Sequence, residues 1–228
     1  MAGLHPCGCE ISAQHAQLCH YQGGSKETLT SCVVLDCQQY VNTDFKPANI
    51  LLSGVDTGRI TAKVGDLGLV VPDGYLHNAR PYAMRAPEVF LGQPCIKISQ
   101  VWAVGALLLC WVKPGILGAW DSPHPLINEA WCMAKIKRLF PEWHIPTPEQ
   151  VERPTLKSAV ESAVILSQNE EGPQSIGSFA EETQNLKMPG QLRDLLNLML
   201  VVDPCQRPSA SAVLESKEFK TFQMLGSN

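Results

Sequence analysis

The clearest hydrophobic pattern in the chain is an apolar run at residues 101–112, followed directly by Lys113, Pro114 and Gly115. Proline and glycine stop helices, so the run predicts a helix that ends at this point. Because the run is apolar on all sides, we expect its helix to be buried in a core. It is too short to cross a bilayer, which needs about 20 apolar residues.

Other segments predict helices and short strands around this central helix. Apolar side chains recur at steps of three and four residues between Leu192 and Leu200, which predicts an amphipathic helix. Ser209 can cap a final helix, whose apolar face includes Ala212 and Val213. We also expect helices at residues 29–39, 127–139 and 156–166, and strands at residues 50–52 and 60–64 joined by a turn at residues 56–58.

Four polar side chains suited to phosphoryl transfer follow one another closely. Asp44, Lys46 and Asn49 lie in the segment DFKPAN, and Asp66 opens the turn that ends the next predicted hairpin. Phosphoryl transfer needs a carboxylate that accepts the proton of the attacking hydroxyl and a cation near the migrating phosphoryl group. It also needs oxygen ligands for Mg²⁺. The four residues supply this set.

This segment resembles the catalytic loop of the eukaryotic protein kinases, H-R-D-x-K-x-x-N, and residues 66–68 resemble their D-F-G turn. Three further family motifs have counterparts in the correct order, at residues 85–88 (RAPE), 99–105 (SQVWAVG) and 203–209 (DPCQRPS). The resemblance covers residues 29–222. It implies a mainly α fold of the α+β family, namely a kinase C-terminal lobe with short β-hairpins at the catalytic loop.

The resemblance implies a role for each polar residue of this set. Asp44 would position the substrate hydroxyl, and Lys46 would contact the transferring phosphate of ATP. A lysine at the latter place resembles serine/threonine kinases and not tyrosine kinases. Asn49 and Asp66 would hold Mg²⁺, since hard oxygen donors suit this cation.

Three other residues are expected to have structural roles. The resemblance implies that Glu88 and Arg207 form a buried ion pair. Gln100 stands where the family has a buried aspartate that accepts backbone hydrogen bonds from the catalytic loop. A glutamine oxygen can accept such bonds without charge, and charge-assisted bonds are roughly twice as strong. The sequence therefore predicts that Gln100→Asp would hold the loop more firmly.

Several positions depart from the family pattern. Asn42 and Thr43 replace the usual His-Arg pair, whose arginine contacts a phosphorylated activation segment. Consistently, residues 69–84 contain no serine or threonine. Leu67 in the place of phenylalanine, together with Thr43, resembles the SR-protein kinases, which need no such phosphorylation. Pro81 lies where many serine/threonine kinases have a threonine that bonds the catalytic acid.

The segment before the catalytic loop contains neither a G-x-G-x-x-G motif nor a strand lysine of the V-A-I-K type. Residues 23–26 (GGSK) are superficially similar to a phosphate loop but lack its spacing, which favours a flexible turn. We therefore expect the N-terminal lobe to be missing. Three readings follow: a serine/threonine kinase with weak or absent transfer from ATP to protein hydroxyls, a non-catalytic pseudokinase-like interaction module, or a truncated kinase product.

The resemblance also suggests how the chain is organised. We expect an irregular N-terminal segment at residues 1–27, the kinase-like lobe at residues 28–222 and a tail at residues 223–228. Within the lobe, residues 146–189 are polar and rich in Pro, Gly, Ser and Glu, which favours a short helix followed by a mobile insertion.

Charge and cysteine content narrow the classes of partner and compartment. The net charge of -4 provides no basic surplus for nucleic acid or anionic membranes, so we expect protein substrates or protein partners. Nine scattered cysteines without a secretory signal favour reduced thiols in a cytoplasmic or nuclear protein. A Cys/His cluster near the N-terminus invites a zinc site, but its spacing favours a loosely packed segment; it comprises Cys7, Cys9, His15, Cys19 and His20.

Overall fold

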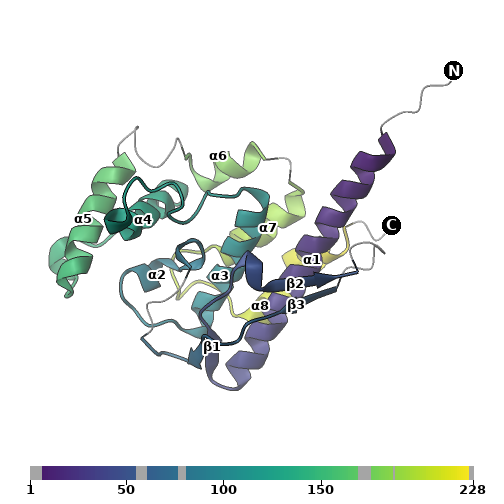
Figure 1. Cartoon of the computed structure of the whole chain (residues 1–228), viewed down its shortest axis with the longest axis horizontal. Coiled ribbons are helices and arrows are strands. Elements are labelled where there is room, and N and C mark those ends of the chain that lie inside the picture. Colours follow the sequence, from purple (N-terminus) through teal and green to yellow (C-terminus); the bar gives the residue numbers. More distant parts are fainter. Residues whose placement is uncertain (1–6, 55–60, 77–80, 169–175, 187, 226–228) are drawn as a thin grey trace.

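A computed structural model of the chain describes residues 7–54, 61–76, 81–168, 176–186 and 188–225, and only the backbone of residues 7–16. Its described part is mainly helical, with a few short antiparallel strands (Figure 1). This arrangement confirms the mainly α fold expected for a kinase-like C-terminal lobe.

The central helix is α3 (Lys97–Val112), and residues 99–109 of it are buried. Its apolar run covers all sides of the helix, so neighbours must surround it. One neighbour is α7 (Gly190–Met199), the expected amphipathic helix. The two helices meet closely at Gly105, where a Cβ atom would lie 2.9 Å from the Cδ2 atom of Leu200. Glycine is therefore needed at this helix contact.

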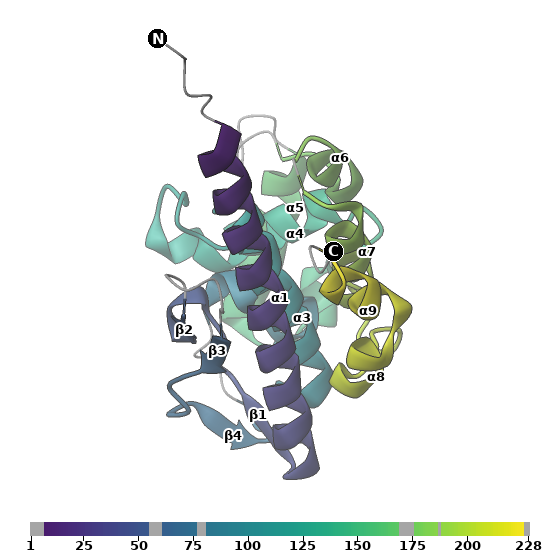
Figure 2. The same cartoon turned by 90° about the vertical axis from the view of Figure 1, so that its right-hand side faces the viewer.

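The first helix, α1 (Cys7–Cys37), is much longer than the sequence predicted. It contacts α3, α8 and strands β1, β2 and β3, and Figure 2 shows it lying along one side of the molecule in front of α3. Residues 7–27, expected to be irregular, are therefore helical. The turn expected at residues 23–26 lies inside this helix.

Gly24 explains why local sequence reasoning missed the helix. Glycine is unfavourable inside helices by about 1 kcal/mol relative to alanine. At this position, however, a Cβ atom would lie 2.6 Å from the Cη2 atom of Trp111 on α3. The glycine lets α1 approach the indole ring, and tertiary packing outweighs the propensity of the segment.

Two small antiparallel sheets flank the helices. Strand β2 (Ile50–Ser53) pairs with β3 (Thr61–Val64), as the sequence predicted, although the turn at residues 56–58 lies outside the described residues. Strand β1 (Tyr40–Asn42) pairs with β4 (Val70–Pro72), and the sequence did not indicate this second pair. Its partners lie far apart along the chain, so the pairing leaves no local pattern.

Within residues 146–189, the short helix that we expected at residues 156–166 is present, and the described part of the segment after it contains a further helix. These helices are α5 (Pro154–Gln168), which packs against α4 (Asn128–Leu139), and α6 (Phe179–Gln184). Val160 and Ala163 on α5 are fully buried, and Phe179 is also in the core. A few apolar residues are sufficient here because they pack against α4.

The remaining elements are short. The 3₁₀ turns η1 (Pro47–Asn49), η3 (Tyr82–Met84), η4 (Pro125–Ile127) and η5 (Pro148–Gln150) and the helix α2 (Pro87–Phe90) connect the longer elements. The chain ends with α8 (Ala210–Glu215), capped by Ser209 as expected, and α9 (Lys217–Gln223), which the sequence did not predict.

The C-terminal segment is tied to α1. Gln22 donates hydrogen bonds from Nε2 to the carbonyls of Phe222 (2.6 Å) and Leu225 (2.9 Å), and Gln223 donates to the carbonyl of Gln22 (3.0 Å). The folded unit therefore extends to Leu225, beyond the tail boundary that we expected at residue 223. These bonds join the C-terminal segment to α1, in addition to the contacts that α1 makes with α3, α8 and the strands.

Two expectations about membranes and metals can be compared with the described residues. None of their helices is both long enough and apolar enough to span a bilayer. Among the described side chains, no three His, Cys, Asp or Glu residues cluster as a metal site. The side chains of Cys7, Cys9 and His15 lie outside the described residues, so the zinc hypothesis remains a prediction.

Burial should make the thiol of Cys132 far less reactive than that of Cys205. Cys132 on α4 is buried, and desolvation raises the pKa of its thiol to about 12, whereas Cys205 is exposed. Since the thiolate is the reactive form, we expect iodoacetamide at pH 8 to alkylate Cys132 at least about 100-fold more slowly than Cys205 in the folded protein. Peptide mass spectrometry measures both rates, with the unfolded chain as the control. Equal rates in the folded protein would contradict the packing of α4.

Candidate functional site

Three predicted site residues meet in the loop after β1. Lys46 donates from Nζ to the Oδ2 atom of Asp44 at 2.7 Å, and Asn49 donates from Nδ2 to the same atom at 2.9 Å. Asn49 also donates to the backbone carbonyl of Asp44 at 2.9 Å. The Asp44 and Asn49 side chains are buried, whereas that of Lys46 is 38% exposed. An amine and a carboxamide are thus held around the carboxylate of Asp44.

The loop that carries Asp44 is fixed by neighbouring side chains. The Asn42 N–H donates to the Oε1 atom of Gln100 on α3 at 2.8 Å, and the Asp44 N–H donates to the Oδ1 atom of Asn42 at 2.8 Å. Thr43 donates twice to the carbonyl of Leu69, from its N–H at 3.1 Å and from its hydroxyl at 2.8 Å. Thr43 therefore joins the loop to the segment after Asp66, a role that the sequence did not indicate.

Asp66 lies in a tight turn next to this loop. Its φ angle is +50°, in the left-handed region that aspartate tolerates better than most residues. Its Oδ1 atom accepts a hydrogen bond from the Gly68 N–H at 3.2 Å. The preceding Gly65 N–H donates to the carbonyl of Asn49 at 2.7 Å, so one backbone bond connects the Asp66 turn to the catalytic-loop segment.

Asn49 and Asp66 are chemically suited to hold Mg²⁺. Asn49 uses its Nδ2 atom for the bonds to Asp44, and in the described part of the chain its Oδ1 oxygen accepts no hydrogen bond. Mg²⁺ usually binds to one or two carboxylates and completes its shell with water and phosphate oxygens. An amide oxygen and a carboxylate on adjoining turns agree with that donor set.

The face around this pair is exposed and partly apolar. Leu51 on β2 is 59% exposed, and Leu67, next to Asp66, is 57% exposed. Two exposed leucines are not by themselves a docking surface, since singly exposed apolar side chains are common on proteins. The Asp66 turn therefore lies at the surface of the described part, whereas Asp44 and Asn49 are buried just beneath it.

Glu88 and Arg207 form an ion pair below the site. The guanidinium donates to both carboxylate oxygens of Glu88, at 2.8 and 3.0 Å, and it donates from Nε to the carbonyl of Val201 at 2.8 Å. Ser99 on α3 donates to the same carboxylate at 2.7 Å. The two charged side chains are 0% and 3% exposed. The pair connects α2, α3 and the turn before α8.

Arg85, in the RAPE segment, connects three elements. It donates to the carboxylate of Glu129 on α4 at 2.9 Å, and its guanidinium lies over the rings of Tyr82 and Phe90 at 4.7 and 4.9 Å from their centroids. Cation–π contacts favour such stacking. The motif at residues 85–88 thus joins α2, η3 and α4. The preceding residues 77–80 lie outside the described residues.

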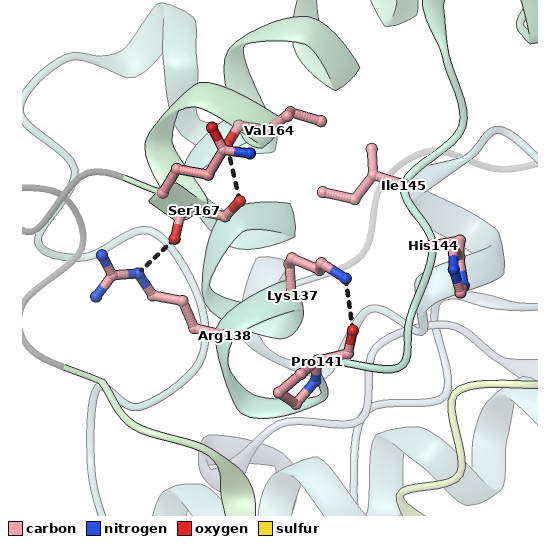
Figure 3. A pocket seen from close by; sticks show the side chains of 8 residues that line it. Lys137, Arg138, Pro141, His144, Ile145, Val164 and Ser167 are labelled. Atoms are coloured by element: carbon pink, nitrogen blue, oxygen red, sulfur yellow. Dashed lines mark hydrogen bonds between the residues drawn. The ribbon is translucent and has the colours of Figure 1, made fainter.

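A cavity of ≈ 300 Å³ lies elsewhere, between the C-terminal ends of α4 and α5 (Figure 3). Lys137 donates to the carbonyls of Pro141 (2.5 Å) and Trp143 (2.8 Å), and Arg138 donates from Nε to the carbonyl of Ser167 (3.1 Å). Cations near the C-terminal end of a helix stabilise its exposed carbonyls. These contacts explain the basic lining as part of the fold, apart from the Asp44 site.

No family model matches the chain. It is 26% identical over 184 residues to the stress-activated protein kinase JNK of Drosophila melanogaster, covering 77% of this chain and 46% of the relative. It is 29% identical over 195 residues to a probable cyclin-dependent kinase 8 of Dictyostelium discoideum, covering 81% and 49% respectively. A shorter match of 34% over 83 residues covers 36% of this chain and 20% of a probable dual specificity protein kinase YAK1 homolog of Encephalitozoon cuniculi.

The chain spans about half the length of the first two of these curated relatives. The matches and the helical architecture agree, because most of the chain aligns with kinases and the described part is mainly α with short antiparallel strands. The protein is therefore related to the eukaryotic protein kinases, and its described part corresponds to their C-terminal lobe.

Proposed function

We propose that this chain carries the catalytic-loop half of a serine/threonine kinase-like site. The observation that carries the proposal is the convergence of Lys46 Nζ and Asn49 Nδ2 on one oxygen of Asp44, at 2.7 and 2.9 Å. This arrangement orients the carboxylate, and orientation of the attacking group is a large part of phosphoryl-transfer catalysis. The substrate class is a protein hydroxyl, by likeness to the related kinases.

Each residue has a defined part in the proposed reaction. The substrate hydroxyl oxygen forms a bond to the γ-phosphorus of ATP, while the bond to the β,γ-bridging oxygen breaks. The Asp44 carboxylate accepts the hydroxyl proton, and the Lys46 ammonium offsets negative charge on the transferring group. Asn49 and Asp66 would hold Mg²⁺, which neutralises charge on the phosphate oxygens.

The same 228 residues support only weak transfer by this chain on its own. They contain no Gly-rich loop of the kinase type and no V-A-I-K-like strand lysine before Asp44. Removal of one well-placed electrostatic group costs about 10²–10³ in rate, and several are absent from this polypeptide. A non-catalytic, pseudokinase-like interaction module is the second candidate, and the same observation favours it.

We expect the isolated chain to bind Mg²⁺·ATP with a Kd weaker than about 1 mM, or about -4 kcal/mol. Titration followed by amide NMR should shift the signals of Asn49, Asp66 and Gly68. Asp66→Ala removes a metal ligand and should abolish these shifts. Asp194→Ala, at an exposed carboxylate on α7, is the matched control and should leave them intact.

Two results would contradict the proposal. Shifts that persist unchanged in Asp66→Ala would show that the nucleotide binds elsewhere. An absence of any Mg²⁺-dependent shift even at nucleotide concentrations many times above about 1 mM would leave the interaction module as the function of the isolated chain.

A further inference from the structure

Gln100 is a fully buried amide that connects three parts of the fold. Its Oε1 atom accepts the Asn42 N–H at 2.8 Å, and its Nε2 atom donates to the Oδ1 atom of Asp36 at 3.2 Å. Asp36 lies in the last turn of α1, Gln100 lies on α3, and Asn42 opens the loop that carries Asp44. The amide thus links a carboxylate on one helix to the backbone of the candidate catalytic loop.

The carboxylate determines which way this amide faces. A carboxamide has an accepting end and a donating end. If it were turned over, its NH₂ group would face the N–H of Asn42, and its oxygen would face the carboxylate of Asp36. Both contacts would be repulsive, and a buried polar atom without a partner is unfavourable. Asp36 therefore fixes the orientation in which Gln100 can accept a bond from the loop.

The hydrogen bonds continue from Gln100 to the candidate catalytic acid. The side chain of Asn42 makes the next connection, because its Oδ1 atom accepts the Asp44 N–H at 2.8 Å. Two bonds that share one amide group polarise each other, so the Asp36 anion strengthens the bond that Gln100 accepts from the Asn42 N–H. Gln100 itself is uncharged, but its side chain contacts the carboxylate of Asp36 on α1, which supplies a negative charge next to it.

We propose that Asp36 is a positioning residue for the Asp44 loop, and that it acts through Gln100. The importance of that loop rests on the proposed function. The expectation from the sequence, that Gln100→Asp alone would hold the loop more firmly, changes accordingly. That substitution would remove the donor to Asp36 and place two carboxylates against each other. In the paired exchange, Asp36→Asn with Gln100→Asp, a donor again faces an acceptor at both contacts and the charge lies next to the loop.

The ionisation of Asp36 can be followed by NMR, and the charged groups near it affect its pKa. Lys97 on α3 and Asp73 after β4 are the charged groups near it, and Asp73 Oδ1 accepts the Lys97 N–H at 3.2 Å. Burial raises the pKa of Asp36, Lys97 opposes this shift, and Asp73 adds to it. The Gln100 side-chain NH₂ signal should therefore titrate above the usual aspartate range of about 3.9. In Asp36→Asn this titration should disappear.

Amide hydrogen exchange of four proteins tests the proposal without nucleotide. We expect exchange at Asn42 and Asp44 to accelerate about threefold to tenfold in Asp36→Asn, and also in Gln100→Asp. The double variant should return exchange to the wild-type rate or below it, as an energetic coupling between contacting residues requires. Asp194→Asn on α7 is the matched surface control. Exchange at Leu195 and Leu196, buried on α7, should stay constant and so exclude global destabilisation.

The proposal would be overturned by unchanged exchange at Asn42 and Asp44 in Asp36→Asn. Acceleration in that variant without recovery in the double variant would also overturn it, because Asp36 would then act by another route. These readouts contain no ATP, so they separate this inference from the proposed function. A loop that responds to Asp36 but gives no Mg²⁺·ATP shift would support the positioning role and reject the catalytic one.

Discussion

Arg207→Met is expected to lower the free energy of unfolding by about 3–5 kcal/mol, because it leaves the buried Glu88 carboxylate without its cation. Both charged side chains are almost fully enclosed, and the guanidinium makes two bonds to the carboxylate. It also bonds the carbonyls of Val201 and Ile98 at 2.8 and 3.2 Å. Urea unfolding, followed by circular dichroism, measures the loss.

Two further variants separate the charge effect from lost packing. Lys157→Met replaces an exposed cation on α5 and should change stability by less than about 0.5 kcal/mol. The double variant Glu88→Met/Arg207→Met should recover part of the loss, because no isolated buried charge remains. If Arg207→Met is no more harmful than Lys157→Met, the pair is not buried as the structure has it.

Trp102→Ala is expected to cost about 3–5 kcal/mol, as for other large-to-small changes of buried aromatic residues. Trp102 on α3 is fully buried, its ring lies 5.5 Å from that of Phe140, and the Arg207 guanidinium lies 5.3 Å above it. The substitution opens a cavity at the centre of the lobe and removes a cation–π contact. Thermal and urea unfolding would both detect the change.

Trp102→Phe provides the control for this second prediction. The indole Nε1 atom is buried and has no hydrogen-bond partner within the described part of the chain. Phenylalanine removes this unsatisfied donor and keeps an aromatic ring, so we expect a loss below about 1.5 kcal/mol. A loss from Trp102→Phe as large as that from Trp102→Ala would indicate that the indole nitrogen has a partner, such as water.

Local sequence patterns were sufficient for several elements. The apolar run at residues 101–112 predicted α3, and the three- and four-residue steps predicted α7, because each helix repeats its own pattern. The β2–β3 hairpin was also predicted, since its strands are close neighbours along the chain. The spacing of Asp44, Lys46 and Asn49 in one loop was sufficient to name them as candidates.

Other elements depend on contacts between distant segments. The first half of α1 carries no helical pattern, and Gly24 opposes it locally, yet the ring of Trp111 requires that glycine. The β1–β4 pair and helix α6 have the same explanation. In each case the stabilising surface belongs to another part of the chain, so no window of sequence contains the signal.

In the candidate site, too, some features follow from the local sequence and others depend on contacts between distant segments. The sequence by itself determined which residue types are present: an acid, an amine and a carboxamide at kinase-like spacing, with a glutamine where an anchoring aspartate is usual. Only the tertiary structure decided that Lys46 and Asn49 share one oxygen of Asp44, that Thr43 joins the loop to Leu69, and that Asp36 accepts a hydrogen bond from Gln100. The physical reason is that hydrogen bonds depend on distance and direction, and α1, α3 and the loop acquire both only when they pack together.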